Sequence, residues 1–126
     1  MNATEAEAVV HDRDGMAIIE LRGRIDGGAE PVVTRAGAEA SALGRPELML
    51  DFAGADYINS TGIALIVGLL ARARAERREV SARGLTPHYR EIFEITRLSD
   101  FMRIVRDDPA VGPDDALATP GPGAST

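Results

Sequence analysis

Apolar and polar residues in the first part of the chain follow a pattern typical of a β-hairpin and then a helix. Residues 8–12 and 16–21 are rich in valine, isoleucine and leucine, and the Arg-Asp-Gly at 13–15 is typical of a hairpin turn. Residues 29–43 have the wider apolar spacing of an amphipathic helix. The Gly-Arg-Pro at 44–46 should end that helix, because proline cannot continue it.

Strand and helix patterns then alternate through the second part of the chain. Residues 47–52 (Glu-Leu-Met-Leu-Asp-Phe) are more continuously apolar than the first two strands, as expected for a strand inside a sheet. We predict a helix at 60–77, a short strand at 79–83, a helix at 87–95 and a last strand at 101–105. This alternation indicates an α/β fold whose strands are mainly parallel after the hairpin. We expect a small sheet of four or five strands with helices packed against it.

The helix predicted at 60–77 carries more apolar residues than one stripe needs. Four of them have the i, i+3, i+4, i+7 spacing of a face that packs on the sheet: Ile63, Ile66, Val67 and Leu70. Leu65 and Leu69 fall outside this stripe. They form either an exposed apolar strip suited to a partner helix or a surface buried under the neighbouring helix.

Composition narrows the class of protein. The chain has 126 residues, 44% of them hydrophobic, which suits one folded domain. A net charge of -6 disfavours direct nucleic-acid binding, and the absence of cysteine excludes disulfides and thiolate sites. Residues 1–7 do not resemble a signal peptide, and the longest apolar run, at 63–71, is too short for a membrane span. We expect a cytoplasmic protein without membrane insertion.

The composition also changes along the chain. Residues 1–7 are acidic and are expected to form a flexible N-terminus, whereas residues 8–106 carry the predicted strands and helices. Residues 107–126 are rich in proline, glycine and aspartate and have little to bury. We expect this tail to be mostly disordered, with at most one helical turn at 114–118.

Ser60 is the residue with the clearest chemical context. It follows a strand and a small polar loop, and it stands where a helix is about to begin. A helix N-terminus presents unpaired backbone N–H groups and a partial positive charge, so it favours a phosphate on a nearby hydroxyl. From these two residues alone, helix capping by Asn59 or Ser60 is the favoured explanation.

Three motifs resemble those of STAS-domain proteins, in particular the anti-sigma factor antagonists of bacteria. The Asn-Ser-Thr-Gly at 59–62 resembles the family's Asp-Ser-Ser-Gly or Asp-Ser-Thr-Gly, in which the first serine is the phosphoacceptor. Residues 21–26 resemble the family's Leu-x-Gly-x-hydrophobic-Asp, and residues 87–98 resemble its third helix and the turn after it. The resemblance covers about residues 8–106 and implies a single STAS domain.

The resemblance implies a switch, not an enzyme. The unphosphorylated chain would bind an anti-sigma factor serine kinase and so indirectly free a sigma factor. Phosphorylation of Ser60 would end this binding, and a serine phosphatase would restore it. No cofactor or metal is expected, and a homodimer is a further candidate assembly. The predicted partner-binding residues surround the serine: Asp26, Asn59, Thr61, Gly62, Leu65 and Leu69.

Two of these residues have alternative roles. Asp26 lies before a Gly-Gly pair, so it either helps to orient a partner near Ser60 or serves only as a turn residue. Gly62 either gives a kinase or phosphatase close access to the serine or lets the backbone pack closely. For Gly68 close packing is the favoured interpretation.

The chain departs from the family pattern at Asn59, where aspartate is usual. Asparagine keeps the capping oxygen but has neither a negative charge nor useful basicity. We therefore expect slower or altered phosphorylation. Two other classes stay open: a non-switching STAS adaptor in a signalling scaffold or a lipid-transport assembly, and a hydrolase that uses Ser60. The sequence around Ser60 is not a Gly-x-Ser-x-Gly nucleophile elbow.

Overall fold

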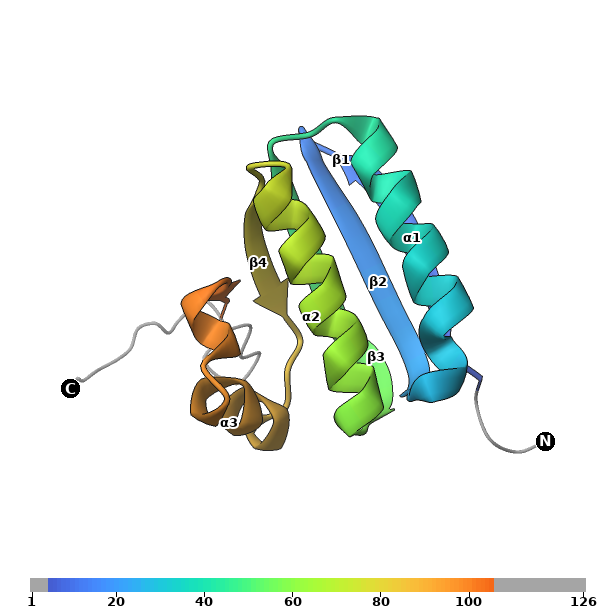
Figure 1. Cartoon of the computed structure of the whole chain (residues 1–126), viewed down its shortest axis with the longest axis vertical. Helices are drawn as coiled ribbons and strands as arrows, with labels where there is room; N and C mark the ends of the chain where they lie inside the picture. The colour runs from blue at the N-terminus through green and yellow to red at the C-terminus, as the bar shows by residue number, and fades with distance from the viewer. Residues whose placement is uncertain (1–4, 106–126) are drawn as a thin grey trace, which may run out of the picture.

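The computed structural model describes residues 5–105, which form one sheet with helices packed on it (Figure 1). The strands are β1 (Glu7–Arg13), β2 (Met16–Ile25), β3 (Glu47–Ile58), β4 (Glu79–Arg83) and β5 (Arg103–Ile104). The helices are α1 (Glu30–Leu43), α2 (Ser60–Ala75) and α3 (Pro87–Ile95), with short 3₁₀ turns at Gly27–Ala29 and Leu98–Asp100. The tail predicted at 107–126, its helical turn and the first residues of the predicted N-terminal segment lie outside the described residues.

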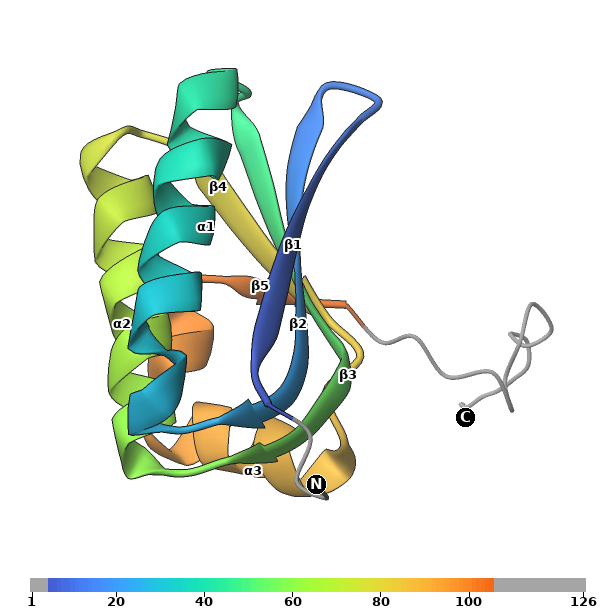
Figure 2. The ribbon, with the colours of Figure 1, turned by 90° about the vertical axis from the view of Figure 1, so that its right-hand side faces the viewer.

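The strands lie in the order β1-β2-β3-β4-β5. β1 and β2 pair antiparallel through the hairpin, and each later neighbour pairs in parallel. Figure 2 shows α1 and α2 side by side on one face of the sheet, with α3 near the end of β3. The predicted α/β class, with an opening hairpin and a mainly parallel sheet, is confirmed. In the described part of the chain, no helix is long and apolar enough to cross a membrane.

β2 and β3 are longer than their sequence predicts. β3 continues past Phe52 to Ile58, and β2 continues to Ile25, through pairs that include Arg24 with Tyr57 and Ile25 with Ile58. The small and polar residues 53–56 have weak strand propensity, so pairing with β2 decides their conformation. As a result, only Asn59 lies between the end of β3 and Ser60, the first residue of α2 (Ser60–Ala75).

The core lies between the sheet and the two long helices. Ile19 and Leu21 of β2, Leu50 of β3 and Ile66 of α2 are fully buried and belong to one hydrophobic cluster. On both strands they alternate with half-buried or exposed residues, which is the pattern of a sheet with one more deeply covered face.

The buried face of α2 differs from the face predicted from the sequence. Leu69 is 6% exposed, and Val67, predicted to face the sheet, is 42% exposed. Leu69 packs against α1 at Gly37: a Cβ atom added to Gly37 would lie 3.0 Å from the Cδ2 atom of Leu69. Because α2 contacts both the sheet and α1, its buried face is wider and rotated relative to the predicted stripe. Of the two alternatives for Leu69, burial under the neighbouring helix is the one observed and the exposed strip is wrong, while Leu65 is half-buried.

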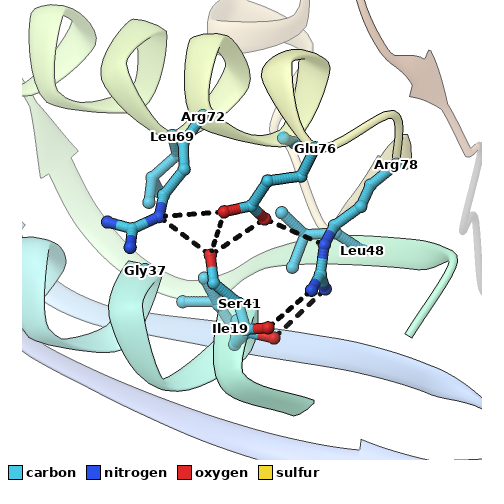
Figure 3. Close-up of a pocket in the computed structure, with 10 residues that line it drawn as sticks. Ile19, Gly37, Ser41, Leu48, Leu69, Arg72, Glu76 and Arg78 are labelled. Carbon is cyan, nitrogen blue, oxygen red and sulfur yellow. Dashed lines mark hydrogen bonds and ion pairs between the residues drawn. The ribbon is translucent and has the colours of Figure 1, made fainter. Parts of the chain in front are cut away.

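A polar cluster joins the C-terminal ends of α1 and α2 (Figure 3). The guanidinium of Arg78 donates to the backbone carbonyls of Ala40 at 3.1 Å and Ser41 at 2.7 Å, and Arg78 Nε lies 3.0 Å from Glu76. The Ser41 hydroxyl donates to Glu76 and accepts from Arg72 Nε at 2.8 Å. Arg78 thus provides a donor to the Ala40 carbonyl at the end of α1 and a second donor to the Ser41 carbonyl, which also accepts the Gly44 N–H.

Because of this cluster, we expect the free energy of unfolding to depend on the ionisation of Glu76. The pKa of Glu76 is lowered, first because the Ser41 hydroxyl donates to its carboxylate and also because Arg78 and Arg72 are nearby. Because the pKa of Glu76 is lower in the folded state, its ionised carboxylate stabilises the fold at pH values above the unfolded-state pKa of about 4.3. This stabilisation is lost as the pH falls from there through the folded-state pKa. In urea unfolding between pH 7 and 3, the stability of the Glu76→Gln variant should therefore fall less than that of the wild type below about pH 4.3. Glu91→Gln, at an exposed position of α3, is the control and should follow the wild type.

Candidate functional site

Ser60 is the first residue of α2 and lies where β2 and β3 end and α1 and α2 begin (Figure 1). Asn59 is the N-cap: its Oδ1 atom accepts the Gly62 N–H at 2.8 Å. Capping is thus performed by Asn59, and Ser60 is exposed. The Ser60 hydroxyl makes no hydrogen bond within residues 5–105, so none of these residues restrains it.

The start of α2 also provides a favourable environment for an anion. Within the described residues, the backbone N–H groups of Ser60 and Thr61 have no hydrogen-bond partner. The first turn of α2 contains no acidic residue. The partial positive charge of the helix end is therefore not neutralised by a carboxylate of the helix itself.

Gly62 is needed for close packing. It is buried, and a Cβ atom built there would overlap the backbone carbonyl of Ile25. Of its two predicted roles, packing is the one that the structure displays. Gly68 behaves oppositely, because it is exposed and a Cβ there would have no neighbour within 4 Å. The predicted packing role of Gly68 is wrong.

Asp26 follows the last residue of β2 and caps the 3₁₀ turn Gly27–Ala29. Its Oδ1 atom accepts the Gly28 N–H at 3.0 Å, and its Oδ2 atom lies 3.5 Å from Arg24 Nε. The Asn59 N–H donates to the carbonyl of Ile25, the residue before Asp26, at 3.3 Å. The end of β2 is thereby attached to the residue before Ser60.

The structure brings together most of the predicted site residues. Asp26, Asn59, Thr61 and Gly62 gather around Ser60, with a Cβ built at Gly27 lying 3.5 Å from Thr61 Cγ2. Leu69 is separated from this surface by its burial against α1. Within residues 5–105, no group of three or more histidine, aspartate or glutamate residues is placed to hold a metal ion.

Two tyrosines lie near the junction of β3 and α2, and the sequence alone did not identify them as part of the site. Tyr57 is 40% exposed, and its ring packs under the guanidinium of Arg24, 4.6 Å from the ring centre. The Tyr89 hydroxyl, from α3, accepts the Ile58 N–H at 3.0 Å. Both contacts join residues distant in sequence, so no local motif could have revealed them.

Comparisons with known proteins agree on one family. The family model described as "Mlab, STAS domain" matches residues 9–106. A protein of Bordetella bronchiseptica, BtrV, assigned as an anti-sigma factor antagonist, is 32% identical over 84 residues, which cover 66% of this chain and 72% of that protein.

Solved structures share the fold at lower identity. An anti-sigma factor antagonist from Mycobacterium paratuberculosis superposes with a TM-score of 0.66 and 23% identity, over 79% of this chain and 85% of that one. The Bacillus protein SpoIIAA in its phosphorylated form superposes with a TM-score of 0.61 and 17% identity, over 86% and 98%. At these identities the superpositions show a common fold.

Proposed function

Because the chain belongs to the STAS domain family, we propose that it is an anti-sigma factor antagonist that works by protein–protein switching. The unphosphorylated form binds a serine kinase with anti-sigma activity, and this indirectly frees a sigma factor. Phosphorylation of Ser60 ends the binding and a serine phosphatase restores it. Sigma factors act in the cytoplasm, so we place the protein there.

The observation that carries this proposal is the free, exposed Ser60 hydroxyl at the start of α2. A phosphate there adds nearly two negative charges beside the unpaired N–H groups of Ser60 and Thr61. Capping and dipole effects are each on the order of 1 kcal/mol and favourable to an anion at this place. Phosphorylation should therefore leave the domain folded and act on the partner, by repulsion and by the desolvation of the phosphate at the contact.

The surroundings of Ser60 support a role as a substrate and not as a catalyst. Within the described residues, no histidine, lysine or carboxylate accepts a hydrogen bond from its hydroxyl, whereas a nucleophilic serine requires such a base. We propose that the chain is not itself an enzyme. Covalent labelling of Ser60 by an active-serine probe would contradict this.

The test is a pull-down from native lysate with Ser60→Ala and Ser60→Asp as baits. The Ala form is expected to retain a serine kinase that the Asp form releases, since the added carboxylate places charge at the contact surface. Thr34→Asp, at an exposed position of α1, controls for charge alone and should retain the kinase. Equal recovery on both Ser60 variants would contradict the switch.

A second candidate function is a non-switching STAS adaptor in a signalling scaffold or a lipid-transport assembly. Two observations favour it: Asn59 brings no charge next to the acceptor, and the matching family model is the one described as "Mlab, STAS domain". In that case Ser60→Ala and Ser60→Asp would capture the same partners, and no phosphate would be found on Ser60 in protein purified from its source.

A further inference from the structure

The backbone N–H of Ile58, the last residue of β3, lies on a side of the strand where no other strand pairs with it. β4 pairs with β3 only as far as Asp51, opposite Arg83, whereas β3 continues to Ile58. Successive N–H groups of a strand point to opposite sides, and the N–H of Asn59 points to β2, where it bonds to Ile25. The Ile58 N–H therefore points to the side that β4 has left, and Ile58 is only 5% exposed. A buried N–H without a partner would be strongly unfavourable.

α3 provides the missing acceptor. The Tyr89 hydroxyl accepts the Ile58 N–H at 3.0 Å, and Tyr89 is half-buried. The start of α3 is held by Thr86, whose Oγ1 atom accepts the Tyr89 N–H at 3.2 Å. Further along α3, Phe93 is fully buried and packs edge-on against Phe52 of β3, with ring centres 5.6 Å apart. α3 is thus attached to β3 at two points: Phe93 packs on Phe52, and Tyr89 bonds to Ile58, two residues before Ser60.

We infer that Tyr89 is a positioning residue for Ser60. This inference rests on the proposed function, because it assigns to Tyr89 a part in presenting the phosphoacceptor to the kinase. The Ser60 hydroxyl has no hydrogen bond within residues 5–105, so its position depends on the backbone. That backbone is held on the β2 side by Ile25 and on the α3 side by Tyr89. Loss of the Tyr89 hydrogen bond would therefore change how the backbone presents Ser60.

The experiment compares Tyr89→Phe with Tyr57→Phe. These are the two tyrosines of the chain, and each variant loses one hydroxyl and keeps its ring. Tyr89→Phe removes the acceptor of the Ile58 N–H. Tyr57→Phe is the matched control, because the Tyr57 hydroxyl has no hydrogen-bond partner within residues 5–105 and the phenylalanine ring can still pack on Arg24.

Two measurements separate positioning from general destabilisation. The first is amide hydrogen exchange, which needs no partner: exchange at Ile58 and Asn59 should be about tenfold faster in Tyr89→Phe, with amides in the middle of α1 changed much less. The second uses the kinase recovered by the Ser60→Ala pull-down. At a temperature where every variant is folded, kcat for Ser60 phosphorylation should fall about three- to tenfold in Tyr89→Phe and stay unchanged in Tyr57→Phe.

The outcomes distinguish this inference from the proposed function. Unchanged amide exchange at Ile58 in Tyr89→Phe would show that Tyr89 does not hold the backbone before Ser60, and this would overturn the inference whether or not a kinase exists. Faster exchange with an unchanged kcat would overturn the positioning role and leave Tyr89 as a structural residue. If wild-type Ser60 is not phosphorylated, the proposed function fails together with the positioning role, while the exchange result still decides whether Tyr89 holds the loop.

Discussion

Gly62→Ala is expected to lower the free energy of unfolding by about 3 kcal/mol, because the new methyl group has no space. A Cβ at this position would overlap the backbone carbonyl of Ile25, and a backbone atom cannot rotate away as a flexible side chain can. The start of α2 would have to move from the end of β2. That movement would also weaken the bond from the Asn59 N–H to Ile25. Urea unfolding followed by circular dichroism measures the loss.

Gly68→Ala in the same helix is the matched control. Gly68 is exposed, and a Cβ there has no neighbour within 4 Å. Because alanine favours helix over glycine, this variant should be more stable than the wild type by about 0.5–1 kcal/mol. The same substitution thus has opposite signs at two positions of α2. A Gly62→Ala variant as stable as the wild type would contradict the packing of α2 on β2.

Phe93→Ala is expected to lower the free energy of unfolding by about 3–5 kcal/mol, the range for removal of a buried aromatic ring. Phe93 is fully buried and packs edge-on against Phe52. Its ring attaches α3 to the sheet, so the cavity would lie between these two elements. The measurement is urea unfolding of the variant and the wild type under the same conditions.

Ile95→Ala is the control on the same helix. Ile95 is 71% exposed, and its truncation should change stability by no more than about 0.5 kcal/mol. A small loss in Phe93→Ala would show that α3 is not held by its apolar face. A large loss in Ile95→Ala would instead mean that a further surface covers that side chain.

The strands and helices could be predicted well because they depend on local periodicity. The predicted limits of β4 and α3 are those of the structure, and α1 differs by one residue. The main error was in β3, which was predicted to end at Phe52 and continues to Ile58. Its last residues have weak strand propensity and become a strand only because β2 lies beside them.

The faces of α2 could not be assigned from one helix alone. Periodicity identifies which residues share a face, but it does not say how many neighbours the helix has. α1 covers Leu69 through the space at Gly37, and Val67 faces outward as a result. Arg78 is a similar case, since its contacts with Ala40 and Ser41 join residues that are far apart in the chain.

The sequence by itself determined the α/β class and the place of Ser60 at the start of a helix, because strand alternation and helix periodicity act over a few neighbouring residues. The motifs around Ser60 also pointed to the family that the comparisons show. Only the tertiary structure decided that Gly62 packs on Ile25, that Leu69 is buried and that Tyr89 bonds to Ile58. Those contacts depend on which elements become neighbours, and the packing of the whole chain decides that.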